Sequence, residues 1–167
     1  MQKLTFSKIS SARLLSCWAD EGIGWMLSPA AEFAAREIDG GNMEAWTAQC
    51  GEEITALLLL VKALPDRDFA DGEGRCYLWG FRVTPALRGQ GIGTALLRRV
   101  LARARELGFR EASIGVEERE EANLRLYRRE GFTKPVKTAL YDPCTPMPDG
   151  RPCEDNFLLL VRTLYEE

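Results

Sequence analysis

The residues best placed for chemistry lie in a glycine-rich segment, Val83-Thr84-Pro85-Ala86-Leu87-Arg88-Gly89-Gln90-Gly91-Ile92-Gly93-Thr94, between a predicted strand and a predicted long helix. The three glycines allow backbone N–H groups to converge, and the first helical turn adds N–H donors and a positive dipole end. Such a turn can cradle a phosphate group. It is not a Walker loop, because no Lys-Ser or Lys-Thr pair follows the last glycine. The segment predicts a phosphate cradle, the alternative being an ordinary connection between two elements.

A second segment, Leu126-Tyr127-Arg128-Arg129-Glu130-Gly131-Phe132, lies 35 residues downstream and places a tyrosine near the end of a predicted helix. The two segments together resemble the GNAT superfamily of acyl-CoA-dependent N-acetyltransferases. Residues 88–93 are similar to its pyrophosphate motif, R/Q-x-x-G-x-G/A, and residues 126–132 are similar to its second signature, L-Y-x-x-x-G-F. The resemblance covers residues 75–135, and the predicted order of the preceding elements agrees with it.

The resemblance implies a single-domain α/β fold with flanking helices and a mixed, mostly antiparallel sheet that is splayed in the middle. Acetyl-CoA, as co-substrate, is expected in the gap between strands 76–83 and 111–116. Arg88 is expected to add positive charge there, the alternative being a solvent-facing side chain. The pantetheine arm is expected to pair with the backbone of Phe81, Arg82 and Val83, and the pyrophosphate to bind Gly89, Gln90, Gly91, Ile92, Gly93 and Thr94.

The resemblance also implies that the amine attacks the thioester directly, so the enzyme has to position the reactants and protonate the departing thiolate. Tyr127 is the predicted acid, the alternative being a core tyrosine. Where the family commonly has asparagine, seven residues before this tyrosine, the sequence has Glu120, and Asn123 is the predicted replacement for that cofactor contact. The amine proton is expected to pass to Glu73, to Glu117 or to a chain of water molecules.

The identity of the amine acceptor does not follow from these motifs. Trp25, Tyr77 and Trp79 are expected to wall its pocket, the alternative being a place in the core. Carboxylates expected near the pocket mouth would favour a cationic amine; they are Asp20, Glu21, Asp71 and Glu73. The predicted function is therefore acetyl transfer to a primary amine of a small molecule or protein. The alternative, a non-catalytic acyl-CoA-binding or regulatory module, would account for Glu120 and for the lack of an evident base.

Hydrophobic periodicity predicts the elements that position these residues. The leucine-rich strand 54–62 is expected to be buried on both faces, and the proline-rich stretch 143–152 is expected to form a loop. The expected elements are, in order, strand 4–8, a helix capped by Ser10 or Ser11, helix 28–39, strands 45–49, 54–62 and 76–83, helix 91–107, strand 111–116, helix 120–130, and strands 132–140 and 156–164.

Strand 76–83 carries three aromatic residues at alternate positions. Tyr77, Trp79 and Phe81 are therefore expected to share one face of the sheet. Gly80 lies inside this strand, where a glycine marks a bulge or a close approach of another group.

The composition of the 167 residues excludes several other classes of protein. Because the chain has no histidine, Ser-His-Asp triads, Cys-His pairs and imidazole-containing zinc sites are excluded, and no metal is expected. Its five cysteines are scattered without a C-x-x-C pair, so free thiols are expected, although Cys144 and Cys153 share the proline-rich stretch. The longest aliphatic run, 56–61, is too short to span a membrane, and residues 1–8 lack a secretory signal. We therefore expect a cytoplasmic location.

The charge distribution points to a small anionic ligand. The net charge is -3, yet residues 85–130 hold ten arginines and seven carboxylates. A basic centre without a lysine-rich tail or an aromatic RNA-binding signature fits a small anion better than nucleic acid. We expect a single domain, 1–167, with acetyl-CoA and an amine acceptor as partners, no membrane and no nucleic acid; a homodimer is compatible with the sequence.

Overall fold

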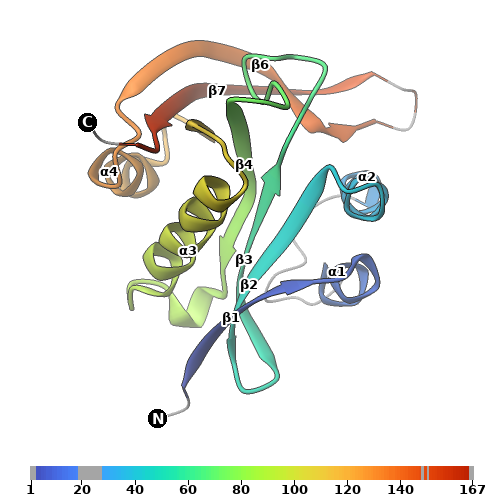
Figure 1. Ribbon diagram of the computed structural model, residues 1–167, viewed down its shortest axis with the longest axis vertical. Helices are drawn as coiled ribbons and strands as arrows, with labels where there is room; N and C mark the ends of the chain where they lie inside the picture. Colours follow the sequence, from blue (N-terminus) through green and yellow to red (C-terminus); the bar gives the residue numbers. More distant parts are fainter. Residues whose placement is uncertain (1–2, 19–27, 148, 150, 166–167) are drawn as a thin grey trace.

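The computed structural model describes residues 3–18, 28–147, 149 and 151–165. Within these residues, seven strands form one sheet in the order β1-β2-β3-β4-β5-β7-β6. All neighbouring strands are antiparallel except β4 and β5, which are parallel. Helices α1 and α2 cover one face of the sheet, and α3 and α4 cover the other (Figure 1). The elements are β1 (Leu4–Ile9), α1 (Ser11–Trp18), α2 (Ser28–Asp39), β2 (Met43–Cys50), β3 (Glu53–Val61), β4 (Arg75–Val83), the 3₁₀ turn η1 (Pro85–Leu87), α3 (Ile92–Glu106), β5 (Glu111–Val116), α4 (Glu121–Arg129), β6 (Lys134–Pro146) and β7 (Pro152–Thr163).

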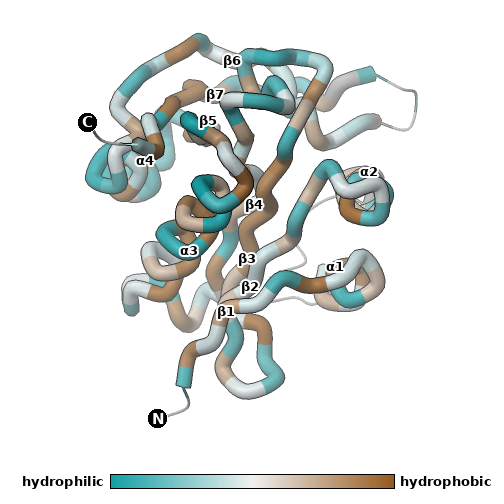
Figure 2. Tube along the Cα trace, viewed as in Figure 1, coloured by the Kyte–Doolittle hydropathy of each residue, from teal (hydrophilic) through white to brown (hydrophobic). Residues whose placement is uncertain are grey.

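The sheet separates two hydrophobic cores, and β3 supplies side chains to both. Leu57 and Leu59 pack under α1 and α2, whereas Leu58 and Leu60 pack under α3 and α4. Burial of each such leucine stabilises the fold by roughly 1.5–3 kcal/mol. Figure 2 shows the hydrophobic residues along the central strands, between the two helical layers. The predicted burial of this strand on both faces is confirmed.

Helix α3 begins and ends at glycines. Gly91 caps its N-terminus with φ 83°, and Gly108 follows its end with φ 90°. Both conformations are left-handed and favour glycine. A Cβ at Gly93, in the first turn, would lie 3.0 Å from the Phe81 ring, so the absent side chain lets α3 begin close against β4. The N–H groups that open α3 therefore lie beside the end of β4.

The alternation of side chains along β4 is interrupted. Gly80 has φ 71°, and the register with β3 shifts beside it, so β4 carries an extra residue there. Tyr77 and Trp79 pack in the core under α1 and α2, whereas Phe81 packs in the core under α3 and α4. The bulge predicted at Gly80 is confirmed. The expectation that the three aromatic side chains share one face is wrong, because the extra residue reverses the alternation after it.

The proline-rich stretch is largely strand. Residues 134–146 and 152–163 form a long hairpin, β6 and β7, with pairing as far as Pro146↔Pro152. The predicted loop 143–152 is therefore wrong at both ends. Pro143 and Pro146 are tolerated because β6 lies at the edge of the sheet, where one row of backbone N–H groups has no partner strand, and because the pairing is irregular between Asp142 and Pro146.

The free thiols predicted for the five cysteines are confirmed, Cys144 and Cys153 included. No helix in the described part of the chain is both long enough and apolar enough to cross a membrane.

Candidate active site

The sheet opens between β4 and β5. Their pairing runs from Arg75↔Glu111 to Leu78↔Ile114, and beyond this point β4 continues beside β3 while β5 continues beside β7. A cavity of about 560 Å³ lies at this opening. The predicted splay is thus present. The cavity is lined by Tyr77, Leu78, Trp79, Gly80, Phe81, Arg82, Arg88, Ile114, Gly115, Glu117, Glu120, Ala122, Asn123, Tyr127, Asp142, Asp155 and Phe157.

Tyr127 brings a phenol from α4 into the wall of this cavity. Its side chain is buried, with edge-to-face contacts to the rings of Phe81 and Phe132 at centroid distances of 6.3 and 6.2 Å. Among the described residues its hydroxyl makes no hydrogen bond. Burial raises the pKa of Tyr127, and the nearby carboxylate of Glu120 raises it further. The phenol therefore stays protonated at neutral pH and can act as a proton donor.

Helix α4 is fixed at its C-terminus, and this fixes Tyr127. The buried carboxylate of Glu130 accepts hydrogen bonds from Nε and Nη2 of Arg98, at 3.0 and 2.9 Å, and so ties α4 to α3. Arg162 of β7 donates to the Glu130 carbonyl at 2.5 Å. Gly131, with φ 95°, then turns the chain. Bidentate pairing of this kind is among the stronger side-chain contacts.

The glycine-rich turn leaves open space at the end of β4. A Cβ at Gly89 or Gly91 would meet nothing within 4 Å, and both residues have positive φ, at 80° and 83°. Nε of Arg88 donates to the Val83 carbonyl at 3.2 Å, so this exposed side chain folds back over the strand end. The turn therefore combines absent side chains, the first N–H groups of α3 and a guanidinium, which suits an anion.

The structure brings eight of the predicted site residues to one cavity. Those that line it are Phe81, Arg82, Arg88, Asn123, Tyr127, Tyr77, Trp79 and Glu117. The side chain of Ile92 is instead in the core under α3. The side-chain amide of Asn123, which was expected to contact the cofactor, donates a hydrogen bond to the Glu120 carboxylate at 3.3 Å. Glu120 is the residue that stands where the family commonly has asparagine. The assignment of the pyrophosphate to residues 89–94 stays a prediction.

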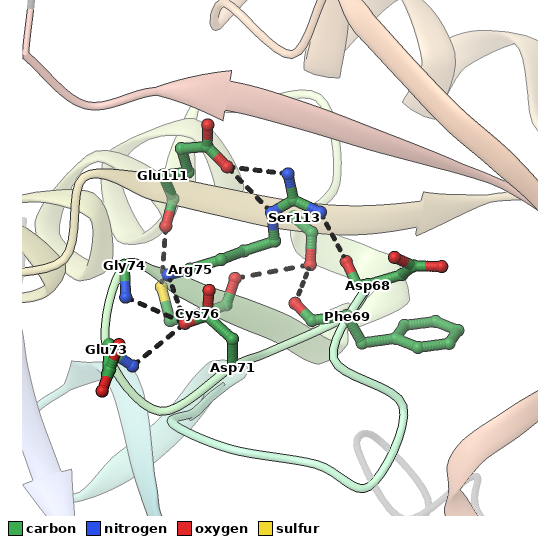
Figure 3. Close-up of polar contacts among 9 residues, drawn as sticks. All are labelled: Asp68, Phe69, Asp71, Glu73, Gly74, Arg75, Cys76, Glu111 and Ser113. Atoms are coloured by element: carbon green, nitrogen blue, oxygen red, sulfur yellow. Dashed lines mark hydrogen bonds and ion pairs between the residues drawn. The ribbon is translucent and has the colours of Figure 1, made fainter.

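Glu73 does not reach the cavity. It is exposed in the turn that precedes β4. This turn adjoins the first part of β4, which pairs with β5 and where Arg75 forms an ion pair with Glu111 (Figure 3). Asp71 organises that turn, because its Oδ1 accepts the N–H groups of Glu73, Gly74 and Arg75 at 2.8 to 3.0 Å. The expected base at Glu73 and the expected place of Asp71 at the acceptor mouth do not fit this arrangement. Three other candidates, Asp20, Glu21 and Trp25, lie outside the described residues.

Asp142 and Asp155 line the cavity, although nothing in the sequence marked them. Oδ1 of Asp142 accepts the N–H of Cys144 at 2.8 Å, and its Oδ2 accepts the hydroxyl of Thr145 at 2.8 Å and the indole N–H of Trp79 at 3.4 Å. Burial raises the pKa of Asp142, and the charge of Asp155 adds to this effect. The long hairpin carries both carboxylates, so its prediction as a loop hid them.

Gly115 makes room for another wall of the cavity. A Cβ there would lie 2.6 Å from two ring atoms of Phe157, far inside van der Waals contact. Gly115 therefore permits the close approach of a side chain from β7. The Phe157 ring occupies the space and lines the cavity beside the two aspartates.

A sequence profile of the acetyltransferase (GNAT) family matches residues 13–132. The chain belongs to this family. N-acetyltransferase 8F1 of Rattus norvegicus is 33% identical to this GNAT protein over 89 residues, which are 53% of this chain and 39% of the relative. Mycothiol acetyltransferase of Geodermatophilus obscurus is 37% identical over 70 residues, 42% of this chain and 22% of the relative. The matched region thus spans less than half of either relative.

Solved structures show the same fold. The ribosomal-protein-S18-alanine N-acetyltransferase of Escherichia coli superposes with a TM-score of 0.72 at 18% identity, covering 99% of this GNAT protein and 96% of that chain. A GNAT family acetyltransferase of Elizabethkingia anophelis with acetyl-CoA bound has a TM-score of 0.63 at 21% identity, with 96% and 97% covered. These likenesses confirm the predicted GNAT fold class.

Proposed function

We propose that this GNAT protein transfers the acetyl group of acetyl-CoA directly to a primary amine. The observation that carries the proposal is the position of Tyr127. A buried phenol that remains protonated lines the cavity where β4 and β5 separate, and the glycine-rich turn lies at the end of the same β4 strand. A proton donor at this place can protonate the thiolate that leaves the thioester, and the turn can bind the pyrophosphate of acetyl-CoA.

The residues at the opening fit acetyl-CoA. Space stays free beside Gly89 and Gly91, where any side chain would intrude, and the N–H groups that open α3 point the positive end of the helix dipole at this space. The part of β4 after Leu78 has no hydrogen-bonded partner in β5, so its edge can pair with an extended pantetheine arm. A solved GNAT relative with acetyl-CoA bound supports this fit.

Acetyl-CoA supplies an activated acetyl group and a thiolate leaving group. Tyr127 gives its phenolic proton to the departing sulfur, and the cavity walls hold the amine near the thioester. We assign the other proton to Glu117. Of the two carboxylates considered as the base from the sequence, Glu117 is the one that lines the cavity; it follows β5 directly and pairs with Arg119 at 3.0 Å. The Glu117 carboxylate accepts the ammonium proton, which frees the lone pair for attack.

The test is a thiol-release assay with acetyl-CoA and a panel of primary amines. Amine-dependent release is expected, with kcat of Glu117→Gln at least roughly tenfold below the parent. Glu118→Gln is the matched control, because Glu118 is adjacent, exposed and outside the cavity, and it is expected to keep the parent rate. Tight CoA binding without release of thiol from any amine would favour a binding or regulatory module instead.

A further inference from the structure

Charged groups of both signs line the cavity. Arg82 and Arg88 lie toward the end of β4, where the proposed function places the pyrophosphate. Asp142 of β6 and Asp155 of β7 line the cavity from the hairpin that packs beside β5. Transfer of an acetyl group as described above uses neither aspartate, because Tyr127 and Glu117 already move the two protons. The presence of Asp142 and Asp155 in the cavity wall therefore needs another explanation.

The two aspartates lie near each other on the hairpin. Asp142 pairs with Cys153, and Asp155 is two residues beyond Cys153 on β7. Both line the cavity, and the charge of Asp155 acts on the carboxyl group of Asp142. Asp155 accepts the N–H of Asn156 at 2.7 Å and forms no ion pair within the described residues. Two carboxylates so placed repel each other, and a bound cation would relieve this repulsion.

The buried side chain of Tyr77 brings to the same space a hydroxyl that has no hydrogen-bond partner among the described residues. Tyr77 is 4% exposed and lines the cavity, and no hydrogen bond holds its hydroxyl within the described residues. The ring is fixed by an edge-to-face contact with Phe69 at 5.0 Å. Burial raises the pKa of Tyr77, and the electrostatic effects of Asp142, Tyr127 and Asp155 act on this hydroxyl. Because Tyr77 lines the cavity and no described residue bonds to its hydroxyl, the lone pair of this oxygen is available to an N–H donor of a ligand.

The walls between these polar groups are aromatic. The rings of Tyr77, Trp79 and Phe157 line the cavity beside the aspartates, and Gly115 is bare so that the Phe157 ring fits. Carboxylates combined with aromatic faces are suited to an organic ammonium group, since the rings contact its carbon chain and stabilise its charge.

We propose that Asp142, Asp155 and the Tyr77 hydroxyl form a subsite for a second ammonium group of the acceptor, so that the substrates are amines carrying two positive charges. The proposal rests on the proposed acetyl transfer, which places the reacting amine near Tyr127. The reacting nitrogen then loses its proton at Glu117 while the distant ammonium stays charged in the acidic subsite. Selection acts mainly on KM, because the subsite holds a part of the substrate that does not react.

The test compares 1,4-diaminobutane with n-butylamine, which has the same carbon chain and one charge. The parent is expected to prefer the diamine in kcat/KM by at least about tenfold, a difference of about 1.4 kcal/mol. Asp142→Asn and Asp155→Asn are expected to lose most of this preference through KM. Glu154→Gln is the matched control, because Glu154 lies on the same strand, is exposed and does not line the cavity. Equal use of the two amines by the parent, or an unchanged preference in both aspartate variants, would overturn the subsite.

A second measurement separates this subsite from the acetyl transfer itself. Calorimetric titration with 1,4-diaminobutane, without acetyl-CoA, is expected to show binding that Asp155→Asn and Tyr77→Phe weaken at least about fivefold and Glu154→Gln leaves unchanged. Such binding without any thiol release would refute the transfer and support the subsite. Thiol release with no preference for the diamine would refute the subsite and support the transfer. If Asp142→Asn unfolds, because Asp142 also holds Cys144 and Thr145, Asp155→Asn and Tyr77→Phe decide the result.

Discussion

Replacement of Tyr127 by phenylalanine is expected to remove proton donation while preserving the structure around the ring. The ring contacts with Phe81 and Phe132 survive the change, because they involve carbon atoms alone. The hydroxyl makes no hydrogen bond to any residue the structure describes, so its loss leaves no partner unsatisfied. We expect the free energy of unfolding to change by no more than about 0.5 kcal/mol, with any change toward greater stability.

The catalytic effect of Tyr127→Phe is expected to be much larger. General acid catalysis is typically worth about 10²- to 10⁴-fold, and solvent can protonate part of the thiolate, so kcat should fall by at least roughly tenfold. This corresponds to a barrier higher by about 1.4 kcal/mol. Because the pKa of Tyr127 is raised above its ordinary value of 10, the parent is expected to show no loss of activity from this group up to about pH 9.

Single-turnover rates of thiol release, measured across pH, are the appropriate assay, because slow product release would mask a change in chemistry. CoA affinity by calorimetry and the melting temperature serve as controls, and both are expected to match the parent. Equal single-turnover rates for the parent and Tyr127→Phe would refute the role of Tyr127 as acid and leave it as a core tyrosine.

Three further changes test other parts of the site and the fold. Gly91→Glu places a carboxylate in the open cradle and forces a residue with a side chain to adopt φ 83°, so calorimetry is expected to show CoA affinity at least tenfold lower, and the free energy of unfolding is expected to fall by about 1–2 kcal/mol. Unchanged CoA binding by a folded variant would contradict the assignment of this turn as the cradle. Gly115→Ala sets a Cβ 2.6 Å from the Phe157 ring, so the free energy of unfolding is expected to fall by about 1–3 kcal/mol, the melting temperature to fall and the KM for the acceptor to rise. An unchanged melting curve would contradict this. Burial would raise the pKa of Glu44, but hydrogen bonds from Arg103 and a neighbouring indole hold this pKa below the ordinary 4.5, so the ion pair stabilises the fold above pH 4.5 and this contribution is lost as pH falls through the lowered pKa. The urea midpoint of Glu44→Gln is therefore expected to fall less than that of the parent when the pH is lowered, and parallel curves of midpoint against pH would contradict this.

Local patterns in the sequence predicted most of the fold. Helical spacing of leucines and the glycines at both ends located α3 to within a residue, because these features depend only on neighbouring residues. The tyrosine of α4 reached the cavity as expected for the same reason. The position of Phe81 could not be predicted by alternation, since a single extra residue at Gly80 reverses the side-chain direction after it.

The acceptor end of the cavity could not be predicted, because it depends on pairing between distant segments. The prolines of β6 are typical of a loop, and only the pairing of β6 with β7 brings Asp142 and Asp155 to the same cavity. Glu73 precedes the right strand, yet the turn before β4 lies at the end of the strand that remains paired with β5. Proximity in the sequence therefore suggested that the carboxylate of Glu73 lies near the site, whereas in the structure β4 separates this carboxylate from the strand end that lines the cavity.

Acetyl transfer itself is tested most directly by incubating the protein with acetyl-CoA and 1,4-diaminobutane and quantifying CoA and the acetylated amine by mass spectrometry. We expect the two products to form in equal amounts, in proportion to protein concentration and time, and at a rate at least roughly tenfold lower in Tyr127→Phe. Saturable CoA binding with no acetylated amine from this diamine or from a broad amine panel would contradict the assignment of this GNAT protein as an N-acetyltransferase.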